Sequence, residues 1–210
     1  MLNVVERGHG WVEVIVGCMF SGKTEEMIRR LRRARIAQQM AVVFKPAIDD
    51  RYDTRDVVSH SEQRIPSIPI KDAKDIEELA GNAQVIGIDE AQFIEGDLVS
   101  VVRRLANSGR RVVIAGLDTD YRGIPFEPMP TLMCEAEFVT KLTAICHKCG
   151  GTAHRTQRIG GGAERVLVGG VALYEARCRQ CWEQPGPDGE PVGQGRLFNG
   201  TEEKNDEEEK

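Results

Sequence analysis

The sequence lacks long apolar runs and, over most of its length, an excess of charge of either sign. No stretch of its 210 residues approaches the ~18 consecutive apolar residues of a membrane-spanning helix, and residues 1–11 lack the basic and apolar segments of a secretory signal peptide. Residues 201–210 contain six acidic residues and two lysines, so they account for most of the net charge of -5. We therefore expect a cytoplasmic protein with no membrane partner, and the nearly neutral remainder does not favour a nucleic acid partner.

The chain also lacks internal repeats and any unusual overall composition. Charged residues make up 29% and hydrophobic residues 40%, which is ordinary for a globular protein. A chain of 210 residues can form one substantial core and a small additional unit. The sequence therefore predicts one main folded domain with an appendage.

Residues 17–24 match the G-x-x-x-x-G-K-T pattern of a phosphate-binding loop. The apolar run 11–16 precedes them, and 25–39 carries apolar side chains at helical spacing, so a strand should lead into the loop and a helix leave it. Backbone N–H groups would then surround a triphosphate, Lys23 would reach its β and γ oxygens, and Thr24 would bind Mg²⁺. The alternative is a glycine-rich turn that matches by accident. The predicted ATP-binding residues are Gly17, Cys18, Met19, Phe20, Ser21, Gly22, Lys23 and Thr24.

Apolar runs alternate with amphipathic segments over the rest of the first 141 residues. Pro66 and Pro69 permit at most an edge strand over 65–70. The predicted strands are 41–44, 85–88 and 111–117, the predicted helices are 71–80, 97–108 and 131–141, and the predicted loops are 47–63 and 118–130. This alternation indicates an α/β fold of the P-loop (RecA-like) type, in which helices flank a mostly parallel sheet.

The character of the sequence changes after residue 141. Cysteine pairs and many glycines follow, and the chain then becomes rich in proline and glycine and finally acidic. We therefore expect a P-loop domain over 1–141, a small zinc-binding domain with a long loop over 142–184, and a disordered acidic tail over 185–210.

Two acidic residues follow the predicted strand 85–88. Asp89 stands where P-loop enzymes hold Mg²⁺, so we expect it to share that ion with Thr24; the alternative is a carboxylate without a special role. Glu90 points to the other side of an extended strand and could act as a general base toward an acceptor hydroxyl or toward water. A hydroxyl acceptor would make the protein a kinase and water would make it an ATPase, and the motif leaves both open.

Four of the six cysteines form two C-x-x-C pairs. Cytosolic cysteines are rarely in disulfides, and this spacing is typical of zinc ligands, although the 28 intervening residues (150–177) exceed the usual length. Four thiolates leave no open coordination position, so one structural Zn²⁺ is predicted; the alternative is four unrelated thiols. The predicted zinc ligands are Cys146, Cys149, Cys178 and Cys181.

Three features, in this order, resemble the class II thymidine kinase family, which comprises the bacterial and human cytosolic type of thymidine kinase. They are the Gly-x-Met-Phe-Ser-Gly-Lys-Thr loop, the Ile-Asp-Glu-Ala-Gln-Phe segment over 88–93, and the two late cysteine pairs. The resemblance extends over 10–182. It implies phosphorylation of the 5′-hydroxyl of thymidine by Mg²⁺ and ATP, giving dTMP for DNA synthesis and ADP. It also implies a homotetramer, feedback inhibition by dTTP, and a lasso-like lid formed by the loop of the zinc domain.

The resemblance assigns roles to individual residues. It implies that Glu90 is the general base and that Arg51 and Lys23 complete the catalytic group. The residues that it implies for substrate binding are Met19, Asp49, Arg51, Phe93, Leu117, Tyr121, Phe126, Thr156, Val166, Leu167, Val168 and Tyr174.

Two other functions are compatible with the motifs. A zinc-ribbon P-loop ATPase acting with nucleic acid would use Glu90 to polarise water, although the nearly neutral body of the chain disfavours it. A nucleotide-gated zinc-binding adaptor would bind ATP without an acceptor, and replacing Glu90 with Gln would leave its function intact.

Overall fold

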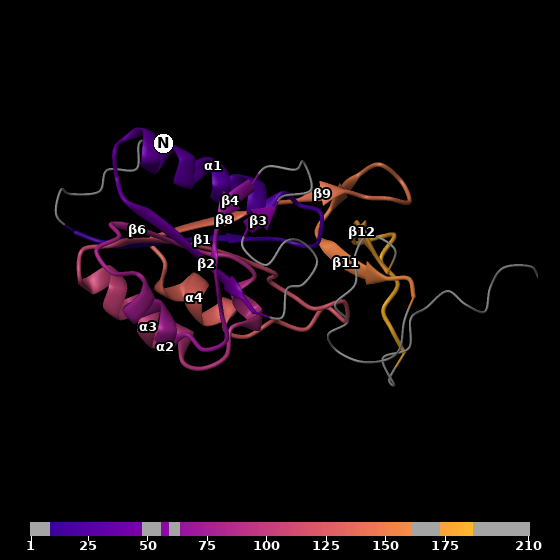
Figure 1. Ribbon diagram of the computed structural model, residues 1–210. Coiled ribbons are helices and arrows are strands. Elements are labelled where there is room, and N and C mark those ends of the chain that lie inside the picture. Colours follow the sequence, from indigo (N-terminus) through magenta and orange to yellow (C-terminus); the bar gives the residue numbers. More distant parts are fainter. Residues whose placement is uncertain (1–8, 48–55, 59–63, 161–172, 187–210) are drawn as a thin grey trace, which may run out of the picture.

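The computed structural model describes residues 9–47, 56–58, 64–160 and 173–186 (Figure 1). Its centre is a six-stranded sheet of strand order β5-β2-β6-β7-β1-β8, in which every neighbouring pair is parallel. The strands of this sheet are β1 (Trp11–Val16), β2 (Ala41–Pro46), β5 (Ile68–Ile70), β6 (Val85–Ile88), β7 (Arg111–Gly116) and β8 (Phe138–Lys141). The predicted α/β fold with a parallel sheet is confirmed.

Helices cover both faces of the sheet, α1 on one side and the others opposite (Figure 1). The helices are α1 (Lys23–Ile36), α2 (Lys74–Leu79), α3 (Leu98–Asn107) and α4 (Met129–Glu135), with a 3₁₀ turn η1 (Ala91–Phe93). Successive strand residues point to opposite faces, so Ile15 packs in the cluster that contains α1, whereas Val14 packs in the cluster that contains α2, α3 and α4. Both faces of the central strands are therefore buried, which explains their unbroken apolar sequences.

Local sequence explains where the two long helices begin. α1 has Glu25 and Glu26 in its first turn and two arginines in its last turn, which complements the helix dipole at both ends. α3 is capped by Asp97, whose carboxylate accepts a hydrogen bond from the backbone N–H of Ser100 at 3.0 Å. Apart from the regions discussed next, the predicted helices and strands are present with shifts of a few residues at their ends.

The predicted helix over 131–141 is wrong in its second half. α4 ends at Glu135, Ala136 has an extended conformation with φ -78° and ψ 137°, and Phe138–Lys141 forms β8. β8 pairs in parallel with β1 at the edge of the sheet. The aromatic and β-branched residues of this segment favour a strand, and the open edge of β1 offers it backbone partners.

Two predicted loops also need correction. α4 begins at Met129, so the loop predicted over 118–130 is too long, and Pro130 lies in the first helical turn, where proline is tolerated. Within the loop predicted over 47–63, β3 (Asp56–Val58) pairs antiparallel with β4 (Arg64–Pro66). Residues 48–55 and 59–63 of that stretch lie outside the described residues. The edge strand expected within 65–70 is present as β5.

Two small antiparallel sheets follow β8 and lie beyond the carboxyl ends of the central strands (Figure 1). They pair β9 (Ala144–Ile145) with β10 (Thr152–Ala153), and β11 (Arg155–Arg158) with β12 (Tyr174–Arg177). The backbone N–H of Leu142 donates to the carbonyl of Val16 at 2.8 Å, so the chain enters these sheets directly beside the end of β1. Within the described part of the chain, none of the helices has the length and apolar character needed to cross a membrane.

Candidate active site

The G-x-x-x-x-G-K-T loop joins the carboxyl end of β1 to α1, as its sequence predicts. Gly17 has φ 153°, and a Cβ there would lie 2.4 Å from the backbone oxygen of Leu142, so only glycine fits. The Nζ of Lys23, a residue that is 9% exposed, donates to the carbonyl of Cys18 at 2.8 Å. The ammonium group therefore lies over the loop, in the position from which it can reach phosphate oxygens.

The two predicted magnesium ligands meet beside the loop. The hydroxyl of Thr24 donates to the carboxylate of Asp89 at 3.2 Å, and the second carboxylate oxygen lies 3.4 Å away. Asp89 is 6% exposed and is held at the end of β6 by its backbone N–H, which donates to the carbonyl of Phe44 at 2.9 Å. A hydroxyl and a carboxylate are oxygen donors of the kind that Mg²⁺ prefers.

Glu90 follows Asp89 in a left-handed backbone conformation with φ 47° and starts η1. This unusual conformation for a non-glycine residue turns the chain sharply after β6. The side-chain amide of Gln92 donates to Oε2 of Glu90 at 2.6 Å. A carboxylate held at the carboxyl edge of the sheet, next to the phosphate loop, has the chemistry of a general base.

Aromatic side chains gather in the same region. The rings of Phe93, at the end of η1, and Phe126, in the β7–α4 connection, contact edge to face with centroids 5.5 Å apart and an interplanar angle of 89°. Tyr121 in that connection is 2% exposed, and Leu117 follows β7 directly. These residues come from two separate loops, and together they can form an apolar wall.

The small sheets contact the phosphate loop directly. The backbone N–H of Met19 donates to the hydroxyl of Thr156 at 3.1 Å, and the thiol of Cys18 donates to the carbonyl of Ala153 at 3.7 Å. Burial raises the pKa of the Cys18 thiol, which keeps it protonated and suits this donor role. The structure thus brings Thr156 of β11 to Met19 of the loop, although the two lie far apart in the sequence.

Arg158 contacts two of the predicted site residues, although no sequence motif includes it. Its side chain is fully buried, its guanidinium carbon lies 3.9 Å from the ring centroid of Tyr121 and 5.2 Å from that of Tyr174, and its Nη2 donates to the hydroxyl of Tyr174 at 2.6 Å. Strand alternation places Arg158 on the same face of β11 as Thr156, and this spacing was the only signal in the sequence. Tyr121 and Tyr174 are therefore joined through one arginine.

Part of the predicted substrate site falls outside the described residues. These residues are Asp49, Arg51, Val166, Leu167 and Val168.

The two C-x-x-C pairs converge on one point, where their four sulfur atoms lie within 4.8 Å of one another. The backbone N–H of Cys181 lowers the pKa of the Cys178 thiol, whereas hydrogen bonding to the Cys149 sulfur raises the pKa of Cys181 to about 12. A divalent cation bound by these cysteines would replace the protons of their thiols. Soft, closely spaced thiolates in this number fit a tetrahedral metal ion.

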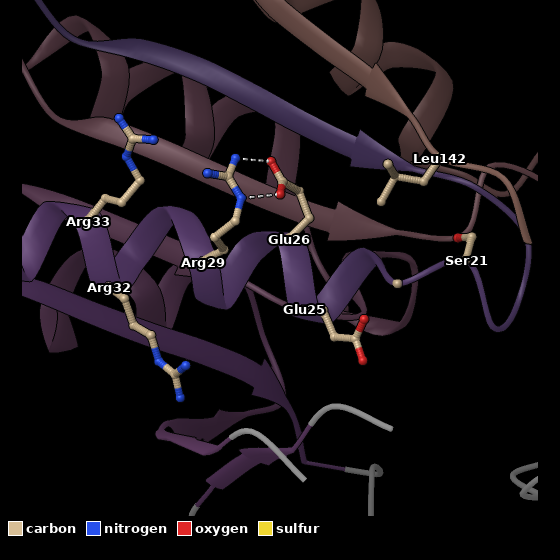
Figure 2. Close-up of a pocket in the computed structure, with 8 residues that line it drawn as sticks. Ser21, Glu25, Glu26, Arg29, Arg32, Arg33 and Leu142 are labelled. Carbon is tan, nitrogen blue, oxygen red and sulfur yellow. Dashed lines mark hydrogen bonds and ion pairs between the residues drawn. The ribbon is translucent and has the colours of Figure 1, made fainter. Parts of the chain in front are cut away.

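A shallow hollow of about 530 Å³ lies beside the loop, along the exposed side of α1 (Figure 2). It is lined by Ser21, Gly22, Glu25, Glu26, Arg29, Arg32, Arg33 and Leu142. In it Glu26 accepts two hydrogen bonds from Arg29, at 2.6 and 2.7 Å (Figure 2). Its lining is charged rather than aromatic, which distinguishes it from the wall formed by Phe93 and Phe126.

A phosphate loop between the parallel strand β1 and the helix α1, with an aspartate at the end of β6, two strands away in the same sheet, defines a P-loop nucleotide-binding protein. The sequence model of the family described as thymidine kinase matches residues 10–182. The chain is also 55% identical over 178 residues to the thymidine kinase of Rhodothermus sp. (strain ITI 518), an alignment that covers 85% of this chain and 84% of that protein. The chain therefore belongs to the thymidine kinase family.

Proposed function

We propose that the protein transfers the γ-phosphoryl group of ATP to the 5′-hydroxyl of thymidine, giving dTMP and ADP for DNA synthesis. Membership of the thymidine kinase family supports this reaction. The structural observation that supports it most directly is the hydrogen bond between Thr24 of the phosphate loop and Asp89, with Glu90 as the next residue. The phosphate-binding residues and a candidate base thereby share one edge of the sheet.

In the proposed reaction the loop from Gly17 to Thr24 binds the phosphates of ATP. Its backbone N–H groups and the Lys23 ammonium neutralise negative charge on the phosphate oxygens, which is the main source of catalysis in phosphoryl transfer. The hydroxyl of Thr24 and the carboxylate of Asp89 would hold Mg²⁺, which would neutralise negative charge on the phosphates of ATP. Both groups are oxygen donors, within 3.2 Å of each other.

Glu90 would accept the proton from the 5′-hydroxyl as that oxygen attacks the γ-phosphorus. Arg51 would position the reacting groups, with Asp49 beside it; both roles follow from the family resemblance. Met19, Phe93, Leu117, Tyr121 and Phe126 would contact thymine, together with Thr156 and Tyr174. Val166, Leu167 and Val168 would belong to a lid, which would protect ATP from water.

The cysteine cluster would bind one structural Zn²⁺. With four thiolates as ligands the ion has no open position for substrate, so its role would be to hold β9 to β12 together. The bonds from these strands to Cys18 and Met19 support a coupling between the metal unit and the phosphate loop. The proposed division into residues 1–141, 142–184 and 185–210 rests on the changes in sequence composition along the chain. A homotetramer and inhibition by dTTP remain predictions that the family resemblance implies, and a cytoplasmic location remains a prediction from the sequence.

Product analysis tests the proposed function. Purified protein is incubated with Mg²⁺, ATP and each deoxynucleoside in turn, and an acceptor-free reaction measures ADP release. We expect thymidine to yield a 5′-monophosphate in equal amount to ADP. Equal release of ADP without an acceptor, and no monophosphate, would favour the ATPase instead.

Replacement of Glu90 separates the kinase from the adaptor function. We expect Glu90→Gln to bind ATP normally and to lose at least about 100-fold in kcat, because the general base is removed. Isothermal titration with ATP and the same product assay measure the two properties. Turnover at the rate of the unsubstituted protein would exclude Glu90 as the base.

A further inference from the structure

The side chain of Gln92 connects the candidate general base to the strand next to it. Its Nε2 donates to Oε2 of Glu90 at 2.6 Å, and its Oε1 accepts a hydrogen bond from the backbone N–H of Leu117 at 3.0 Å. Gln92 is 7% exposed and lies in η1, whereas Leu117 directly follows β7. One buried amide therefore bridges the acidic segment after β6 and the start of the β7–α4 connection.

Chemistry fixes the direction of this amide. The backbone N–H of Leu117 can only donate, so the Gln92 carbonyl must face it. The NH₂ group then faces the Glu90 carboxylate, to which it can only donate. A hydrogen bond to an ionised carboxylate is shorter and stronger than one between neutral groups, so this contact can fix the orientation of the Glu90 carboxylate.

Strand β7 leaves room for the side-chain amide of Gln92 because the strand ends at Gly116. A Cβ on Gly116 would lie 2.7 Å from Oε1 of Gln92 and 2.7 Å from the sulfur of Met129. Gln92 is thus packed against the backbone of β7 as well as hydrogen-bonded to it. Its own rotamer is restricted, so it can restrict the carboxylate that it contacts.

We propose that Gln92 is a positioning residue that holds the Glu90 carboxylate toward the acceptor hydroxyl. This inference depends on the proposed role of Glu90 as the general base. A glutamate side chain has several rotatable bonds. When a second residue fixes its orientation, less conformational entropy is lost on reaching the reactive geometry. The same amide also accepts a hydrogen bond from the backbone of Leu117, which is one of the residues proposed to contact thymine. Gln92 therefore also fixes the position of the base relative to the proposed thymine site.

Kinetics of Gln92→Leu test the inference. Leu retains the side-chain volume but removes both hydrogen bonds, so kcat for thymidine should fall about 10- to 100-fold, as expected for a misplaced catalytic group. The KM for ATP and the affinity for ATP should not change. Unchanged kcat, or a loss that appears only in KM, would overturn the proposal.

A double substitution distinguishes positioning from a general structural role. If Gln92 acts through Glu90, then adding Gln92→Leu to Glu90→Gln should not reduce the residual rate further. Residual rates are measured in long incubations with radiolabelled thymidine. A further drop of the same size as in the single substitution would overturn the proposal.

Gln92→Glu is the second variant, in case the leucine variant folds poorly. It keeps the acceptor for Leu117 but places a second carboxylate against Glu90, so kcat near pH 7 should again fall about 10-fold or more. The matched control is Gln157→Leu, which removes another buried glutamine with both ends bonded, here to the backbone of Glu183 at 2.7 and 3.1 Å. This control should retain the original kcat. An equal fall in kcat in Gln157→Leu and in the Gln92 variants would overturn the proposal.

The same assay separates this inference from the function on which it rests. Failure of the unsubstituted protein to form dTMP would overturn the proposed function. Formation of dTMP, its loss in Glu90→Gln, and full activity of both Gln92 variants would overturn the role of Gln92 alone.

Discussion

At the scale of single residues, the candidate site depends on side chains that fix other side chains. Arg158 is buried between two tyrosines, and it combines a stacked contact at 3.9 Å with a hydrogen bond at 2.6 Å. A guanidinium is suited to this because it stacks on an aromatic ring and donates in its own plane at the same time. Tyr121 and Tyr174 are consequently held in one arrangement although Tyr121 belongs to the β7–α4 connection and Tyr174 to β12.

We expect Arg158→Met to raise the KM for thymidine about tenfold or more and to leave the KM for ATP unchanged. The buried cation–π contact contributes roughly 2 kcal/mol, and 1.4 kcal/mol corresponds to about a tenfold change in affinity. Steady-state kinetics with each substrate varied in turn measure both constants. The control is Arg155→Met on the same strand, where the guanidinium lies over the ring of Trp182 at 5.0 Å. An equal rise in KM in both variants would contradict a specific role for Arg158.

At the scale of elements, α1 serves both the core and the surface. Met27, Ile28 and Leu31 are fully buried against the sheet, while Glu26 and Arg29 pair on the opposite side, beside the hollow (Figure 2). The hydrogen bond from Arg29 lowers the pKa of Glu26 to about 2. The first turn of α1, which adjoins the phosphate loop, is thus supported by a pair that requires an ionised carboxylate.

This pair should make stability depend on pH in the acid range. A glutamate in the unfolded chain titrates near pH 4.3, so the contribution of Glu26 is complete above that pH and is lost as pH falls toward its folded pKa of about 2. Glu26→Gln should lower the free energy of unfolding at pH 7 by about 1 kcal/mol or less, because Arg29 is partly exposed. The difference from the unsubstituted protein should shrink between about pH 5 and pH 3.

Urea unfolding followed by circular dichroism across this pH range measures the difference. Glu25→Gln serves as the control, since it removes a charge from the same turn but keeps the Glu26–Arg29 pair. A difference for Glu26→Gln that stays constant down to pH 3 would contradict the assigned cause.

At the scale of the whole molecule, the parallel sheet contacts, at the phosphate loop, the part of the chain that contains the small sheets β9 to β12 and the cysteine cluster. Gly17 approaches Leu142 so closely that no side chain fits, and Met19 bonds to Thr156. The apolar cluster that contains Cys18 also contains Cys146. Loss of structure in the part of the chain that contains β9 to β12 and the four clustered cysteines should therefore change the geometry of the phosphate loop.

Removal of one predicted zinc ligand tests this coupling. Cys178→Ser should reduce the metal content from about one zinc per chain to near zero, lower the melting temperature and raise the KM for thymidine. Elemental analysis, thermal denaturation and kinetics measure these properties. Cys134→Ser, which changes an exposed cysteine of α4, should leave all of them unchanged. Full metal content and activity in Cys178→Ser would contradict the predicted ligand set.

The prediction of secondary structure failed where the side-chain pattern was compatible with both a helix and a strand. Residues 131–141 have apolar side chains compatible with a helix, yet β8 forms over Phe138–Lys141 because β1 offers an open edge. The register of that pairing depends on a strand more than a hundred residues away in the sequence. Local spacing carries no information about such a partner.

The sequence by itself determined the features whose chemistry lies in a short segment. The loop over 17–24, the Asp89–Glu90 pair and the two C-x-x-C pairs need only neighbouring residues in a defined order, so their patterns are visible without coordinates. The tertiary structure decided which distant side chains meet, namely Gln92 with the backbone of Leu117 and Arg158 with Tyr121. The physical reason is that burial and hydrogen bonding select partners by distance in space, and that distance is set only when the whole sheet has formed.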